Sequence, residues 1–479
     1  MRFILLIDGM THSLNEPSDI KKQDIFSLIF AFVILLLSIY LPPSYGLTRN
    51  SQIMIGILIM AAMLWITEPI PLPATGILIM ILQPMLGLIP ADKVFSSFGN
   101  QAVFFLIGAF IIAGAIEKQG LHRRIALGFL KRFENNPRIF TFGIIFSSAL
   151  LSFIIPGHGV AALFLPIITS ILLAMRVIPK ESNFGKISML SVAYGSSIGS
   201  LGTLVGGARN PLTVGILSNH GINISFMQWM IYAVPIVLIA IPVVWFLLQI
   251  VFPIEVLDIS LAKKKIEEQL AAQGSINRDE VKTAGILLFT IILWFLFSNS
   301  DFGLAGIALL GSFLLFLTKC ISWKDVEQRL PWGIILMYGG AITLGVGLEE
   351  TGAGGWIAQT MLTFMRGNPF FIILGIILVT VILTNVMSNT GAVAVLLPIG
   401  ISLAYELPSI SPLLASMLIA LSGGFAFMFI IATPANAIAY SSGYLSMRDL
   451  LKAGVFANIA CVIIIYTIAL IYWRGVLGL

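Results

Sequence analysis

Two similar stretches decide the fold: "IIPGHGVAALFLPI" at residues 154–167 and "VMSNTGAVAVLLPI" at residues 386–399. They lie 232 residues apart and share a glycine, Gly159 and Gly391, that opens an apolar segment ending in Leu-Pro-Ile. The three residues before that glycine differ, being Pro-Gly-His in the first stretch and Ser-Asn-Thr in the second. Such a pair indicates an internal duplication in which one copy has changed.

The composition indicates that the chain uses the lipid bilayer as its solvent. Hydrophobic residues make up 58% of the sequence and charged residues 10%, which is too few charges to cover a soluble domain. Apolar segments long enough to cross a hydrocarbon core recur along the chain, and these predict an all-α polytopic membrane protein. The two cysteines and four histidines show no disulfide or metal-site spacing. We attribute the net charge of +5 to loop orientation and expect no nucleic-acid partner.

Several apolar segments are short, or end in polar, Gly-rich or Pro-rich sequence within the expected membrane region. This pattern is typical of re-entrant hairpins and broken helices, which require cover from protein or a cavity. We predict re-entrant hairpins at 139–177 and 369–406, and single broken spans at 187–220 and 412–443. About 11 transmembrane helices then cross the membrane.

The distribution of basic residues predicts the orientation. Of the 27 Lys and Arg residues, 22 fall in segments predicted to be cytoplasmic, 4 fall outside, and Arg209 belongs to neither group. This asymmetry obeys the positive-inside rule, so we expect a cytoplasmic N-terminus and an external C-terminus in the cell inner (plasma) membrane. The test fixes sidedness but does not prove the hairpins, since counting each hairpin limb as a crossing leaves the orientation unchanged.

The repeat divides the chain into four parts. We predict a cytoplasmic tail at 1–24, a first repeat with a leading helix at 25–252, a cytoplasmic linker at 253–281 and a second repeat at 282–479. A regulatory or lipid-binding role is the alternative for the charged linker.

Further matched residues extend the duplication, and the two copies have opposite orientations. Glu117 and Gly120 match Glu349 and Gly352 at the same spacing of 232, and Asn210 matches Asn436 at 226. Inverted repeats with discontinuous helices are the architecture of secondary transporters, which bind substrate between the repeats at the midplane. A duplicated channel or membrane enzyme is the alternative, but no catalytic constellation is evident.

The second hairpin tip has groups that can bind both an anion and a cation. Ser388, Asn389 and Thr390 would begin its second limb, where free backbone N–H groups carry partial positive charge and bind anions. The carbonyl groups that end the first limb suit a small cation. The stretch "ATPANA" at 432–437 supplies a matching break in the facing helix. One tip can therefore hold a cation on one side and an anion on the other.

Taken together, four motifs resemble the divalent-anion/sodium symporter family, whose members transport dicarboxylates, citrate and sulfate. The motifs are the SNT…LLPI tip, "FIIATPANAIAYSSGYLSMRDLLKAGV", "AYGSSIGSLGT" and "TEPIPLPATG", and the resemblance covers the chain from about residue 25. It implies a homodimer with a scaffold and a mobile, elevator-type transport domain. It further implies one sodium ion at each hairpin tip, with the anion between them.

The resemblance carries two sets of roles onto the second repeat. It implies that the substrate-binding residues here are Ser388, Asn389, Thr390, Thr433 and Pro434. It implies that a sodium ion is held by Thr384, Asn389 and the carbonyl region of Ala432.

The first repeat departs from the family pattern. Where the family has Ser-Asn-Thr, this chain has Pro-Gly-His, and where the family has Gly-Thr-Pro-Pro-Asn it has Gly-Gly-Ala-Arg-Asn at 206–210. Only a degenerate cation site remains, formed by Ser152, Gly157 and Gly206. It is degenerate because Gly157 stands where the family has asparagine, and glycine supplies no side-chain oxygen. The substrate-binding candidates here are His158, Gly159, Arg209 and Asn210.

An arginine near the bilayer centre is costly and indicates a functional site. We infer that Arg209 replaces the missing sodium ion and binds part of the anion, which would leave sodium coupling reduced or altered. The alternative is that Arg209 caps hairpin carbonyls and never meets the substrate. His158 has three open interpretations: a neutral hydrogen-bond donor, a proton carrier or a packed polar residue.

Three other functions are alternatives: a cation antiporter or arsenite-type permease, a membrane enzyme, and a channel, which alternating-access kinetics with counterflow would exclude. A sodium/proton antiporter or arsenite-type permease shares this architecture, but cation antiport needs carboxylates at the midplane. The carboxylates near the spans are expected at span ends or in a loop: Glu68, Glu117, Glu349, Glu350, Glu406 and Asp301. A membrane enzyme would need a nucleophile–base pair or metal cluster, and the histidines offer neither. The pattern therefore predicts a transporter of di- or tricarboxylates or sulfate, without naming the anion or the coupling ion.

Overall fold

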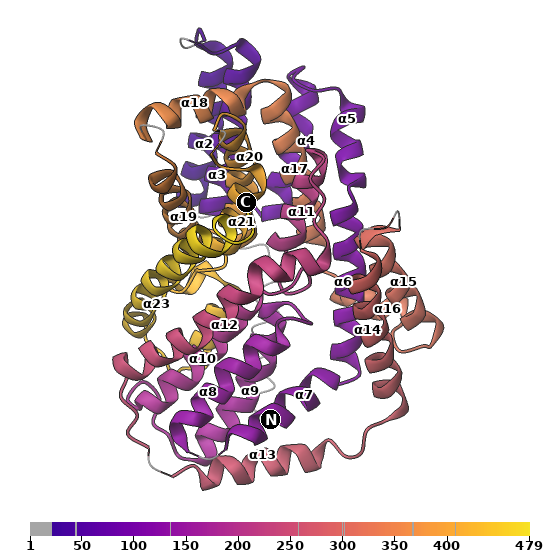
Figure 1. The fold of residues 1–479 in the computed structure, drawn as a ribbon, viewed down its shortest axis with the longest axis vertical. Coiled ribbons are helices and arrows are strands. Elements are labelled where there is room, and N and C mark those ends of the chain that lie inside the picture. Colours follow the sequence, from indigo (N-terminus) through magenta and orange to yellow (C-terminus); the bar gives the residue numbers. More distant parts are fainter. Residues whose placement is uncertain are drawn as a thin grey trace.

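The structure, a computed structural model, describes residues 22–43, 46–134, 136–256, 258–298, 300, 302–365, 368–407 and 409–479. All regular secondary structure in these ranges is helical (Figure 1). Most of the predicted tail at 1–24 lies outside the described residues, as does Asp301. The expectation of an all-α membrane protein is confirmed, since eight described helices are long and apolar enough to cross a membrane and six apolar helices are shorter.

Two sets of helices follow a leading helix, α2 (Lys22–Tyr40). The first set is α3 (Arg49–Thr67), α4 (Leu72–Met85), α5 (Ala91–Ser96), α6 (Gln101–Lys118), α7 (Leu121–Leu130), α8 (Pro137–Leu151), α9 (Gly157–Ala174), α10 (Asn183–Gly199), α11 (Arg209–Asn219) and α12 (Phe226–Val251). The second set is α14 (Arg278–Phe297), α15 (Gly303–Leu317), α16 (Trp323–Arg329), α17 (Trp332–Glu350), α18 (Ala353–Met365), α19 (Pro369–Val386), α20 (Asn389–Tyr405), α21 (Pro412–Ser422), α22 (Pro434–Ser441) and α23 (Met447–Ile468). Each helix of the first set has a counterpart in the second, in the same order.

The segment between the sets, which the sequence predicts to be a linker at 253–281, is partly helical. It contains a charged helix, α13 (Ser260–Ala272), along the lower edge of the molecule in Figure 1. The next helix, α14, begins at Arg278, four residues earlier than expected. The reason is a capping box in which the Asn277 side chain accepts from the Glu280 backbone at 2.7 Å and Glu280 accepts from the Asn277 backbone.

Equivalent hydrogen bonds in the two copies support the internal repeat. The Asn210 amide donates to the carbonyls of Ser200 and Thr203, and the Asn436 amide donates to those of Ala426 and Phe429. All three pairs of equivalent residues are 226 apart. The two hairpins point in opposite directions, with α8 and α9 in the lower half of Figure 1 and α19 and α20 in the upper half.

Helix breaks interrupt α10–α11 and α21–α22 as the sequence predicts. On the first-repeat side, glycines let α10 pack directly on the backbone of α8. A Cβ on Gly195 would lie 2.4 Å from the Ile145 carbonyl oxygen, and one on Gly199 would lie 2.2 Å from that of Ala149. This contact fixes the broken helix against the hairpin and thereby places the break beside the hairpin tip.

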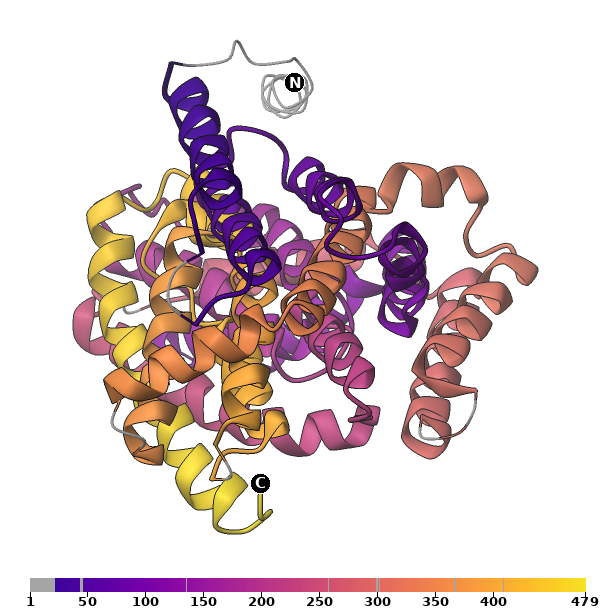
Figure 2. The same ribbon diagram turned by 90° about the horizontal axis from the view of Figure 1, so that it is seen from above.

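Helices α14, α15 and α16 form an arm on one side of the molecule, away from α23, in both Figure 1 and Figure 2. The arm exposes large apolar side chains, among them Leu288, Leu296 and Phe313. Such a surface suits contact with lipid in a multi-pass membrane protein.

Candidate functional site

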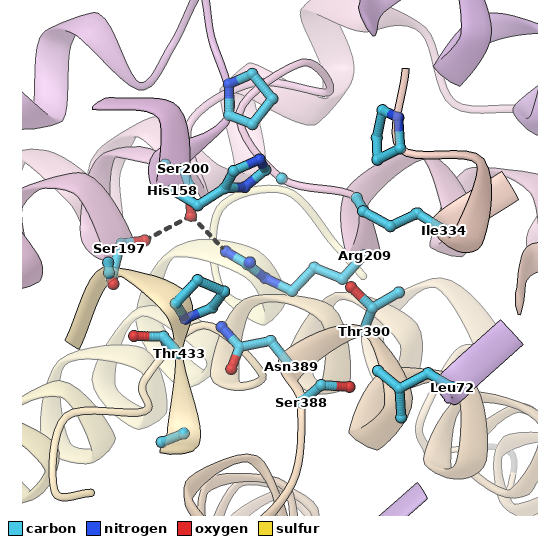
Figure 3. A pocket seen from close by; sticks show the side chains of 18 of the residues that line it. Leu72, His158, Ser197, Ser200, Arg209, Ile334, Ser388, Asn389, Thr390 and Thr433 are labelled. Atoms are coloured by element: carbon cyan, nitrogen blue, oxygen red, sulfur yellow. Dashed lines mark hydrogen bonds between the residues drawn. The ribbon is translucent and has the colours of Figure 1, made fainter. Parts of the chain in front are cut away.

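A cavity of about 550 Å³ lies where both hairpin tips and both helix breaks meet (Figure 3). The tips contribute residues 156–158 and 388–390, and the breaks contribute residues 206–209 and 430–435. Its remaining wall comes from the ends of α3 and α10, from α4 and α6, and from the start of α17. Segments more than 200 residues apart in sequence thus converge on one site, as the inverted repeat predicts.

The second tip presents a helix N-terminus to this cavity. The Ser388 hydroxyl accepts from the Gly391 backbone N–H at 3.2 Å, so it caps α20. Asn389 and Thr390 are the first two residues of α20, and both line the cavity. The structure therefore gives Ser388 a capping role and leaves the Thr390 hydroxyl and the free N–H groups of the first turn facing the cavity.

Oxygen atoms converge behind this tip at the predicted sodium position. The Thr384 hydroxyl lies 2.9 Å from Asn389 Oδ1 and 2.7 Å from the carbonyl oxygen of Gly423. One hydroxyl proton cannot serve both acceptors, so this group of neutral oxygens has capacity for a cation. Neutral carbonyl, amide and hydroxyl oxygens at helix ends are the ligands that transporters use for Na⁺. The residues present therefore fit a sodium ion.

The facing break places Ala432, Thr433 and Pro434 on the cavity wall. Thr433 begins α22, and its hydroxyl oxygen accepts from the Asn436 backbone at 3.0 Å. The hydroxyl proton stays available as a donor toward the cavity. Two helix N-termini, those of α20 and α22, therefore face the same space.

The first tip lacks the available oxygen atoms of the second tip, because its own backbone groups are hydrogen-bonded to each other. The Gly157 N–H donates to the Gly206 carbonyl oxygen at 3.2 Å, which occupies an oxygen that a cation would need. A Cβ on Gly157 would lie 2.8 Å from the carbonyl oxygen of Ser196, so no side chain fits there without a backbone shift. The Ser152 hydroxyl donates to Ser148 within its own helix.

Arg209 extends from the first-repeat break to the second repeat. Its side chain is 4% exposed, Nε donates to the Ala420 carbonyl at 3.2 Å, and Nη2 donates to the Ser200 hydroxyl at 2.9 Å. Ala420 lies in the last turn of α21, where the helix end carries partial negative charge. No hydrogen bond joins Nη1 to a described residue. In Figure 3 the guanidinium lies between His158 and Asn389. Arg209 thus caps a helix and also faces the cavity.

The other first-repeat candidates divide into one that reaches the cavity and two that do not. His158 is the second residue of α9 and lines the cavity. Gly159 lies outside the lining, and a Cβ there would meet Glu117 Oε1 at 3.0 Å. Asn210 is fully buried beneath the break, with its amide nitrogen bonded to two backbone carbonyls. The prediction that Gly159 and Asn210 contact the anion is therefore corrected: they shape the tip and the break.

Sequence reasoning missed the wall opposite the tips. Leu72, Ile334 and Phe110 line the cavity, and so does Glu68, which was expected at a span end away from the site. Glu68 does end α3, in a left-handed conformation with φ of 46°, but that helix end lies at the cavity. The "TEPIPLPATG" segment was the available signal, since it interrupts an apolar run with a charge and three prolines.

Two inverted repeats, two re-entrant hairpins and a cavity lined by both hairpin tips and both helix breaks define a secondary transporter. A profile of the family described as "Sodium:sulfate symporter transmembrane region" matches residues 22–479. The chain therefore belongs to this family, and the resemblance seen in the motifs is confirmed.

Relatives agree with this membership, and solved structures show a similar fold. The chain is 27% identical over 491 residues to the "Sodium-dependent dicarboxylate transporter SdcS" of Staphylococcus saprophyticus, covering 97% of this chain and 94% of the relative. It is 30% identical over 442 residues to an "Uncharacterized transporter" of Haemophilus influenzae, covering 88% and 91%. In fold it is similar to the YdaH transporter of Alcanivorax borkumensis, with TM-score 0.55, 12% identity and coverage of 81% and 90%. MtrF of Neisseria gonorrhoeae gives TM-score 0.55 at 13% identity, covering 95% and 96%.

Proposed function

We propose that this protein is a secondary active transporter of small divalent anions, either di- or tricarboxylates or sulfate. The observation that carries the proposal is the cavity in which the N-termini of α20 and α22 and the Arg209 guanidinium face one another. Helix N-termini and a buried arginine both stabilise negative charge, and a guanidinium matches the planar geometry of a carboxylate. The site residues would be Asn389, Thr390, Thr433, His158 and Arg209.

We further propose that one sodium ion, or none, accompanies the anion. The oxygen group around Thr384 and Asn389 would hold that ion, whereas Arg209 supplies the second positive charge permanently. The similarity to the sodium-dependent dicarboxylate transporter of Staphylococcus saprophyticus supports sodium as a coupling ion, and the hydrogen-bonded tip at Gly157 supports a reduced number of ions. Assembly as a homodimer, elevator-type movement and a cytoplasmic N-terminus in the plasma membrane belong to the same proposal.

The test is counterflow in proteoliposomes with a panel of labelled anions: succinate, malate, tartrate, citrate and sulfate. Sodium concentration and pH are varied separately, so that sodium, proton and exchange coupling can be told apart. Thr390→Ala should lose uptake of the preferred anion, and Thr363→Ala, on the surface helix α18, serves as the matched control. Uptake of none of these anions by folded protein would refute the proposal.

A further inference from the structure

The Arg209 guanidinium lies between two glycines that belong to different repeats. A Cβ on Gly207, in the first-repeat break, would lie 2.9 Å from Nη1. A Cβ on Gly424, just beyond the end of α21, would lie 2.7 Å from Nη2 and 3.1 Å from Cζ. These approaches are shorter than van der Waals contact, so a side chain at either position would displace the guanidinium. The two glycines therefore form a slot for it, which we call the guanidinium slot.

The polar groups of the slot fix one edge of the guanidinium. Nε donates to the Ala420 carbonyl, and Nη2 donates to the Ser200 hydroxyl. That hydroxyl in turn donates its proton to the Ser197 carbonyl at 2.7 Å, so its oxygen is left to accept from Arg209 (Figure 3). Nη1 has no hydrogen bond to a described residue, and it lies beside Gly207, which lines the cavity. The slot thus leaves Nη1 on the cavity side.

The second repeat has the reverse arrangement of side chains at its break. Gly207 and Arg209 are the equivalents of Thr433 and Ala435, since both pairs are 226 apart. The Thr433 side chain caps α22, whereas α11 begins without a side-chain cap. Losing a cap destabilises the start of a helix. The first break therefore lacks a stabilising side chain at the one position where it would collide with the guanidinium.

The direction of the Arg209 side chain follows from the two helix ends that it joins. Arg209 is the first residue of α11, where the helix dipole is unfavourable for a cation. Its side chain extends away from that end and places the guanidinium beside Ala420, in the last turn of α21, where the dipole is favourable. The helix ends thus set the direction of the side chain, and the slot sets where Nη1 comes to lie.

We propose that Gly207 and Gly424 are positioning residues of the anion site, which hold the Arg209 guanidinium with Nη1 directed at the bound anion. The proposal rests on the proposed function and deepens it, because it makes the orientation of Arg209 a determinant of anion affinity in addition to its charge. Both glycines act through Arg209, so neither should matter to the anion once the guanidinium is removed.

The experiment is a double-mutant cycle on the full-length protein. Gly207→Ala and Gly424→Ala are each made with Arg209 present and in the Arg209→Ala background. The Kd is measured for whichever of succinate, citrate and sulfate the unaltered protein binds. With Arg209 present, each glycine variant should raise the Kd about 5- to 30-fold, because the hydrogen bond to a charged donor is weakened. In the Arg209→Ala background each should change the Kd less than about twofold.

A control variant and a kinetic measurement separate positioning from a general structural effect. Gly114→Ala, in α6, makes the same chemical change where the nearest atoms to a Cβ lie at an ordinary 3.6 Å, and it should leave the Kd unchanged. In counterflow, the two slot variants should raise the KM for the anion and leave the rate at saturating anion within about twofold, since the guanidinium is displaced and not removed.

Two results would overturn the proposal. One is an equal rise in Kd with and without Arg209, because a glycine that only the backbone requires would act in both backgrounds. The other is an unchanged Kd in both slot variants. A Cβ on Gly424 would also meet Leu201 Cδ2 at 2.5 Å. If Gly424→Ala does not fold, Gly207→Ala decides, since Nη1 is the only atom within 3.0 Å of its Cβ.

Thermal unfolding of the same variants tests the slot without any anion. Each glycine variant should lower the unfolding temperature more with Arg209 present than in the Arg209→Ala background, because the displaced guanidinium loses its bonds to Ala420 and Ser200. If this coupling is found but the unaltered protein binds none of the anions, the proposed function fails and the slot stands. If anions bind and the coupling is absent, the slot is wrong.

Discussion

Replacing Arg209 with alanine tests whether this residue supplies a positive charge to the anion. Truncating one partner of a buried charged contact costs about 2–5 kcal/mol. The structure narrows this range, because Nε and Nη2 already bind Ala420 and Ser200, which leaves Nη1 for the anion. Losing one hydrogen bond to a charged group costs about 1.5–3 kcal/mol, which overlaps the first range at about 2–3 kcal/mol. We therefore expect the Kd for the anion to rise about 30- to 150-fold.

The assay is anion binding to purified protein by calorimetry, combined with counterflow in proteoliposomes at several sodium concentrations. Arg209→Lys should recover part of the affinity, since an ammonium keeps the charge but not the planar fork. Ser200→Ala is the matched control, because it removes one partner of the guanidinium and leaves the charge; its Kd should rise less than about tenfold. Thermal unfolding of each variant separates loss of fold from loss of binding.

One result would refute the reasoning. If folded Arg209→Ala protein binds the anion with unchanged affinity and unchanged ion dependence, then Arg209 only caps the end of α21. The inference that Arg209 replaces a sodium ion would then be wrong, and the hydrogen bond to Ala420 would be its whole role.

Four further predictions concern the two tips and the two breaks. Asn389→Ala should abolish both uptake and its dependence on sodium, because the Asn389 amide oxygen belongs to the group of oxygens around Thr384. Thr390→Ala should weaken binding of the anion without changing the dependence on sodium. If both variants changed anion binding and sodium dependence equally, this division of roles would be wrong. The Hill coefficient for sodium in uptake should be near one, or sodium should not be required, and a value clearly above one would show that the first tip still binds an ion. Gly157→Asn should lower the unfolding temperature rather than restore a second ion, because the Ser196 carbonyl leaves no room. Asn210→Ala and Asn436→Ala should each lower the free energy of unfolding by about 2–4 kcal/mol, since two buried carbonyls lose their donor in each case. A denaturant titration that shows no loss would mean that these amides do not stabilise the helix breaks.

The sequence by itself determined the features that depend on neighbouring residues and on the repeat. Apolar runs interrupted by Ser-Asn-Thr and by Thr-Pro-Ala-Asn predicted helix ends in the membrane, because caps and prolines act within a few residues of where they stand. The matched residues at 226 and 232 predicted paired hairpins and breaks, and the twin hydrogen bonds of Asn210 and Asn436 confirm that pairing.

Only the tertiary structure decided which of these residues face the cavity. Asn210 and Gly159 were predicted to contact the anion, yet one lies beneath the break and the other lies against Glu117. Glu68 was expected at a span end, and packing of α3 and α4 against α17 brings that end to the cavity wall. These features depend on how side chains from helices hundreds of residues apart in sequence pack against each other. No local sequence pattern encodes that packing.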